Sequence, residues 1–245
     1  MTERDSLILG VETATLGGSV SVTQGHTVLA TKIGDPQISH SNTLLRDIEE
    51  ILQRSNIRLS EIDLFAAACG PGSFTGLRIG LATVKGLAAM LRRPCAGVPT
   101  LQAIARAAGE SRAVVALLPA GRGEVFAQLL SVGSQGNVAE LDVAAHLSPP
   151  NLMKRYAHYS NLKWAGPGAH LHRDIIMNHA ADKSIPFSEQ SASPGWVLAP
   201  WEKNLANHVN IIAAEKLRNG QTVEADALTA VYLRPSDAEL KKACP

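Results

Sequence analysis

The chain has 245 residues, enough for one large domain or two small ones with a substantial core. Hydrophobic residues make up 45% of it, charged residues 18% and aromatic residues only 4%, so Ala, Leu, Ile and Val must form most of the core. The formal net charge of +1 excludes a strong overall attraction to nucleic acid or anionic membranes, and leaves a local basic groove open.

The cysteines and the apolar runs indicate in which cellular compartment the protein is located. Cys69, Cys95 and Cys244 are isolated from one another, which excludes a CxxC zinc ribbon and a disulfide framework and is typical of free thiols in a reducing compartment. The charged start at residues 1–5 precedes a short apolar run, which predicts a first strand and no signal peptide. No apolar stretch approaches the length of a membrane span. We therefore expect a cytoplasmic protein without membrane contact.

The first half of the chain predicts a three-stranded meander followed by alternating helices and strands. Apolar or alternating runs predict strands at 7–11, 19–23, 27–33, 62–69 and 96–98. Helical spacing predicts helices over 44–52, 73–91 and 100–108, and Ser41 or Asn42 is a candidate cap for the first.

The second half repeats this order less clearly. Strands are predicted at 113–118, 124–131, 138–143 and 162–165, with a helix at 149–158, an irregular stretch at 182–200 and a final helix at 201–219. Two successive β-β-β-α-β-α halves indicate an α/β protein made by internal duplication, with the boundary near Gly109. We expect one subdomain at 1–108 joined by the returning segment 201–220, a smaller one at 109–200, and a tail at 221–245.

The segment from Gly70 to Gly80 is a tight turn that leads into a helix. Gly70 and Gly72 permit φ values that other residues resist, and Pro71 fixes its own φ. The free N–H groups at the start of such a helix attract anions, including phosphate. The candidate nucleotide- or anion-binding residues are Glu12, Thr13, Gly72, Ser73 and Thr75. A well-capped helix without a ligand explains the same residues equally well, and no Walker-type Gly-Lys-Ser/Thr follows.

Gly76 and Gly80 lie one turn apart inside this predicted helix. Each costs up to ~1 kcal/mol of helix stability relative to Ala. A helix that carries both is expected to use them for close approach of a neighbouring element.

These motifs resemble the bacterial TsaB family, also called YeaZ. The run from Ile8 to Thr15 is similar to the start of that family, and Gly70–Gly80 matches its central motif nearly residue for residue. Shorter matches lie at 40–41, 86–88, 97–101, 123–126 and 231–234. The resemblance is dense in the first half and sparse in the second.

The resemblance implies a fold, a process and a set of partners. TsaB proteins are similar to actin, sugar kinases and Hsp70, so it implies a duplicated actin-like, RNase H-like ATPase fold of two βββαβα subdomains, the second one degenerate. It implies that TsaB, the catalytic subunit TsaD and the ATPase TsaE together transfer a threonylcarbamoyl group to N6 of adenosine 37 in tRNAs that read codons starting with A. In that scheme TsaB is a non-catalytic partner that meets tRNA through the complex.

Metal and catalytic residues are not expected. TsaD-type proteins hold a metal with a pair of histidines on a helix, and residues 97–105, at the corresponding place here, contain no His. His40 has no second His one turn away, and His170 and His172 are too close in sequence to share a helical face. The sequence therefore predicts no metal site and no cofactor.

Two departures from the family weaken an ATP site. Glu12 stands where the family and its relatives usually have the Asp that helps to hold magnesium, and Pro119 replaces the Asp of a usual Asp-Ala-Arg segment. Glu12 is expected to be a solvated or hydrogen-bonded carboxylate at a strand end.

The resemblance also implies that the two helices of the first half bind TsaD. The residues predicted to bind the partner are Leu44, Leu45, Ile48, Ile51, Leu52, Leu77, Gly80, Leu81, Val84 and Ala88. The second helix is apolar nearly all round, which fits a partner contact or a self-contained core equally well. Without a partner, the same surface is expected to pair two copies as a homodimer.

Two enzyme classes compete with this interpretation. An independent nucleotide phosphohydrolase or kinase is suggested by the glycine-rich turns at 15–18 and 70–72. A metalloprotease is excluded by the lack of a zinc motif such as HExxH.

Overall fold

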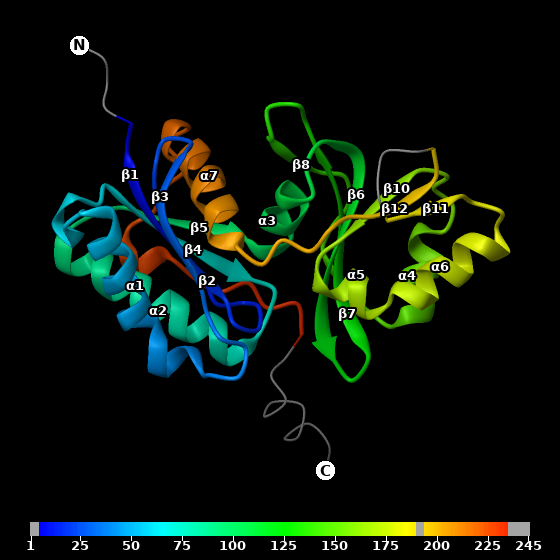
Figure 1. Cartoon of the computed structure of the whole chain (residues 1–245), viewed down its shortest axis with the longest axis horizontal. Coiled ribbons are helices and arrows are strands. Elements are labelled where there is room, and N and C mark those ends of the chain that lie inside the picture. Colours follow the sequence, from blue (N-terminus) through cyan, green and yellow to red (C-terminus); the bar gives the residue numbers. More distant parts are fainter. Residues whose placement is uncertain (1–4, 190–193, 235–245) are drawn as a thin grey trace. The chain divides into compact units, whose positions relative to one another are not determined.

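The computed structural model describes residues 5–189 and 194–234 (Figure 1). The charged residues 1–4, residues 190–193 of the predicted irregular stretch, and residues 235–245 of the predicted tail, with Cys244, lie outside the described residues. The chain divides into two compact units. Unit 1 extends to Ala103 and includes Lys203–Val231, whereas unit 2 contains Ile104–Glu202 and the residues after Val231.

Unit 1 is built on a five-stranded sheet in the order β3-β2-β1-β4-β5. Its strands are β1 (Leu7–Glu12), β2 (Ser19–Gln24), β3 (Thr27–Ile33), β4 (Leu64–Gly70) and β5 (Cys95–Pro99). β2 is antiparallel to its two neighbours β1 and β3, and β4 and β5 run parallel to β1. The helices of unit 1 are α1 (His40–Ser55), the 3-10 turn η1 (Leu59–Glu61), α2 (Phe74–Leu91), α7 (Leu205–Arg218) and the 3-10 turn η2 (Ala225–Ala227).

The alternation of side chains along β1 separates the two faces of this sheet. Leu7 and Leu9 pack in one hydrophobic core with residues of α1 and α2. Ile8 points to the opposite face, which α7 covers (Figure 1). The helix predicted from residue 201 begins at Leu205 and packs on unit 1. Unit 1 is thus a sheet with helices on both faces.

Residues 221–231, which the sequence analysis assigns to a tail, form a strap along unit 1. Val223 and Cys95 exchange backbone hydrogen bonds of 2.8 and 2.7 Å at the edge of β5. Lys85 of α2 donates to two strap carbonyl oxygens, including that of Leu228 at 3.1 Å. The Leu228 side chain is buried in the core of unit 1. The strap therefore fastens the end of this unit to α2 and to the sheet edge.

Unit 2 repeats the same topology. Its strands are β6 (Ser111–Gly121), β7 (Glu124–Val132), β8 (Val138–Glu140), β9 (Ala145–Leu147), β10 (Leu162–Ala165), β11 (Phe187–Ser188) and β12 (Trp196–Leu198). The order β8-β7-β6-β10-β12 and the strand directions match those of β3-β2-β1-β4-β5. The short strands β11 and β12 lie in the stretch predicted to be irregular, and the predicted strand at 138–143 ends at Glu140.

The helices of unit 2 mark it as the degenerate copy. They are α4 (Pro149–Tyr156), α5 (Pro167–Leu171) and α6 (Arg173–Asp182), and α3 (Thr100–Ala107) leads into this unit from β5. Gly166-Pro167-Gly168 follows β10, and the corresponding Gly70-Pro71-Gly72 begins at the last residue of β4. Gly70 and Gly166 have φ of 117° and 93°. Where unit 1 continues into the long helix α2, unit 2 has two short helices. The predicted duplicated, actin-like α/β fold is confirmed.

Candidate functional site

The ten residues predicted to bind a partner lie on α1 and α2, and all except Leu45 are buried. The buried ones are Leu44, Ile48, Ile51, Leu52, Leu77, Gly80, Leu81, Val84 and Ala88. Most of them pack in the core of unit 1 together with the sheet. These side chains are therefore buried within the protein itself. The residues predicted to bind the partner lie mainly on the sides of the two helices that face the core.

The outward surface of the same helices uses other residues. On α2, Ala82 and Ala89 are exposed, and Met90 is 65% exposed, as is Leu45 on α1. α2 is also long and apolar enough to cross a membrane by length and composition, but this test equally selects the core helix of a soluble protein.

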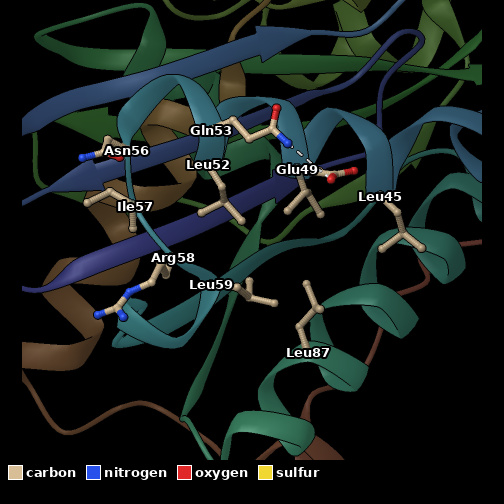
Figure 2. A pocket seen from close by; sticks show the side chains of 10 residues that line it. Leu45, Glu49, Leu52, Gln53, Asn56, Ile57, Arg58, Leu59 and Leu87 are labelled. Carbon is tan, nitrogen blue, oxygen red and sulfur yellow. Dashed lines mark hydrogen bonds between the residues drawn. The ribbon is translucent and has the colours of Figure 1, made fainter.

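A groove of about 520 Å³ opens between α1, η1 and α2. Figure 2 shows the side chains of Leu45, Leu52, Leu59 and Leu87 directed toward this space. The remaining lining residues are Ile48, Glu49, Gln53, Asn56, Ile57 and Arg58. The groove thus has an apolar floor and polar or charged groups along its border.

Several groove residues were not predicted from the sequence. Leu87 was not among the residues predicted to bind the partner, and no role was predicted for Ile57 and Leu59. The available signal was the presence of these two apolar residues in the short connection after α1.

The predicted anion-binding site at the start of α2 is filled by the loop that follows β1. The backbone N–H of Ser73 donates to the carbonyl oxygen of Ala14 at 2.9 Å, and the Ser73 hydroxyl accepts from the Gly76 N–H at 3.2 Å. A Cβ added to Gly72 would overlap Ala14. Thr75 is exposed beside them. The first N–H groups of this helix are therefore partly satisfied within the protein.

Glu12 is completely buried at the end of β1. Its carboxylate accepts hydrogen bonds of 2.7 Å from both the N–H and the hydroxyl of Thr15. Burial raises the pKa of Glu12, because it disfavours the charged form, and the Thr15 hydrogen bonds oppose this shift. The adjoining cavity, also lined by Lys32 and Asp47, has a volume of only about 10 Å³, which is the space of a single water molecule. Of the two alternatives for Glu12, the hydrogen-bonded carboxylate is correct.

Two of the histidines considered as metal ligands make internal contacts. His40 Nε2 lies 3.2 Å from the carbonyl oxygen of Thr15, and His170 Nε2 lies 2.9 Å from that of Ala199. Burial lowers the pKa of His172. Within residues 5–189 and 194–234, no three His, Cys, Asp or Glu side chains gather as a metal site would require.

The geometry defines a class of protein: a duplicated actin-like α/β protein in which the loop after β1 is hydrogen-bonded to Glu12 and to the start of α2. A family model described as "TsaD: tRNA N6-adenosine threonylcarbamoyltransferase" matches residues 35–181. The chain is 30% identical to the tRNA threonylcarbamoyladenosine biosynthesis protein TsaB of Escherichia coli over 233 residues, 93% of this chain and 94% of that protein. The solved structure of YeaZ from Pseudomonas aeruginosa superposes with a TM-score of 0.72 at 26% identity, covering 93% of this chain and all of that one. The chain belongs to the TsaB (YeaZ) family of tRNA threonylcarbamoyladenosine biosynthesis proteins.

Proposed function

We propose that this chain is a non-catalytic subunit of the complex that forms N6-threonylcarbamoyladenosine at position 37 of tRNAs reading codons that start with A. In this role it scaffolds and activates a TsaD-type catalytic subunit, together with a TsaE-type ATPase, in the cytoplasm. Family membership supports the process. The internal use of Glu12 and of the start of α2 supports a role without its own nucleotide chemistry.

The groove between α1 and α2 carries the proposal of a partner. An apolar floor with a polar border is the usual composition of a protein interface. Leu45 is 65% exposed at this groove, which makes it the side chain best placed to be buried by a partner. The TsaD-type subunit docks here, a second copy of this chain occupies the same face when that subunit is absent, and tRNA is met through the complex.

The test compares two Leu→Asp variants that differ only in location. Leu45→Asp introduces a charge at the groove, whereas Leu171→Asp does so on α5 of unit 2, where Leu171 is 62% exposed. Calorimetric titration with a TsaD-type protein should show at least about a 30-fold weaker Kd for Leu45→Asp, as loss of a central apolar anchor typically costs about 2 kcal/mol or more. Leu171→Asp should bind as the unmodified chain does. Equal binding by all three would contradict the proposed face.

The absence of catalysis needs its own experiment. We expect titration of the isolated chain with Mg-ATP to give no heat of binding at micromolar concentrations, because loop residues fill the start of α2. Micromolar binding would favour an independent kinase or phosphohydrolase.

A further inference from the structure

We propose that the loop residues Thr13–Thr15, called the staple below, connect the first turns of α1 and α2. We propose further that Thr13 is a positioning residue for partner binding. This inference rests on the proposed function, because it concerns the two helices that border the docking groove. It assigns a role to residues that do not line the groove.

The contact of Thr13 with α2 depends on the two helical glycines. The Thr13 hydroxyl donates to the carbonyl oxygen of Gly76 at 2.8 Å, and this side chain is buried. A Cβ on Gly76 would overlap the Thr13 carbonyl oxygen, and a Cβ on Gly80 would overlap the Thr13 hydroxyl. Gly76 and Gly80 thus form a notch that receives Thr13. The predicted use of these glycines for close approach is confirmed.

The same loop is tied to α1 and to the sheet. His40, the first residue of α1, places Nε2 3.2 Å from the carbonyl oxygen of Thr15. Thr15 in turn donates its N–H and its hydroxyl to the buried Glu12 carboxylate on β1. Ala14 accepts the Ser73 N–H just before α2. Three consecutive loop residues therefore hold the starts of both helices.

The groove makes this staple relevant to binding. Its walls are α1 and α2, so its width depends on the distance and angle between these helices. Less conformational entropy is lost on binding when the two helices are already held in place than when binding must order them. Weakening the staple should therefore lower the affinity for the partner even in a variant that remains folded.

The experiment uses substitutions at Thr13 with a matched control. Thr13→Val removes the hydroxyl at nearly constant volume, Thr13→Ser keeps it, and Thr27→Val makes the same change at an exposed position of β3. Titration with a TsaD-type protein, at a temperature where circular dichroism shows each variant folded, should give about a three- to tenfold weaker Kd for Thr13→Val, the effect of one buried hydrogen bond. Thr13→Ser and Thr27→Val should bind as the unmodified chain does.

A second pair keeps the inference testable if Thr13→Val does not fold. Glu12→Ala removes the anchor of Thr15, whereas Glu12→Gln retains an acceptor for the Thr15 N–H and a group that can bond its hydroxyl. Glu12→Ala should weaken binding and Glu12→Gln should not. If the unmodified chain binds, Leu45→Asp does not, and Thr13→Val and Glu12→Ala bind normally, the staple is wrong and the proposed function stands. If the unmodified chain itself fails to bind, the proposed function is wrong, and so is the role of the staple in partner binding.

Discussion

Asn210 on α7 lies directly over Gly10 on β1. Its side-chain amide donates to the carbonyl oxygen of Ile8 at 3.2 Å and to that of Ser21 at 3.1 Å, and the side chain is fully buried. A Cβ on Gly10 would overlap the Asn210 side chain. One amide therefore connects α7 to two neighbouring strands, and only glycine leaves it room.

Asn210→Ala is expected to lower the free energy of unfolding by about 2–4 kcal/mol, because it removes two buried hydrogen bonds and leaves a cavity. Urea denaturation followed by circular dichroism measures this. Asn178→Ala is the control, since Asn178 is exposed on α6 and Ala favours a helix. Equal effects of the two substitutions would contradict the role of Asn210.

Val84→Asp is expected to unfold unit 1, with a cost above about 4 kcal/mol, because Val84 is fully buried in its core. Met90→Asp, on the exposed side of the same helix, should change stability by less than about 0.5 kcal/mol. Circular dichroism and urea denaturation separate the two. A well-folded Val84→Asp variant would show that this side of α2 is not the core-facing one.

Glu12→Gln is expected to stabilise the protein at neutral pH. The pKa of Glu12 is raised in the folded protein above its ordinary value of 4.5, so its contribution to stability is largest below pH 4.5 and is lost as the pH rises through the folded pKa. Thermal unfolding of both proteins between pH 4 and 8 should show a gap that widens with pH. A constant gap would mean that the pKa of Glu12 is the same in the folded and the unfolded protein.

His172→Gln is expected to reduce the acid sensitivity of unit 2. Burial lowers the pKa of His172 below 6.5, so its contribution is fully present above pH 6.5 and is lost as the pH falls through the folded pKa. The tryptophans Trp164, Trp196 and Trp201 all lie in unit 2, so fluorescence-detected unfolding between pH 5 and 8 reports on this unit. If the variant and the unmodified chain lose stability in parallel as the pH falls, another group is responsible.

The fold was predictable because its local signals agree. Alternation and apolar runs located the meander β1–β3 and the strands β4 and β5, and the order of elements showed the duplication. The helices α5 and α6 carried no such signal, since a Gly-Pro-Gly turn and a break at His172 interrupt them. Strands of two or three residues, such as β11 and β12, are too short for a period to be visible.

The candidate site was predictable only in part. The sequence indicated the two helices that border the groove, but α2 is apolar on several sides, so periodicity alone did not determine which side faces the sheet. That choice depends on a long-range contact, Thr13 against Gly76 and Gly80, which no local pattern encodes. The groove also needs Leu59 and Leu87, which come from separate segments.

The return of α7 and the strap to unit 1 affects the order in which the protein matures on the ribosome. All the described strands of unit 1 are synthesised before Thr100, yet Ile8 and Gly10 are covered only when Leu205–Arg218 emerges. Between these moments the whole of Ile104–Glu202 is translated, while one face of the first sheet has no covering helix. A nascent chain stalled near residue 200 should therefore expose apolar sheet surface and attract chaperones, even though nearly all of the Ile104–Glu202 part of unit 2 has been made.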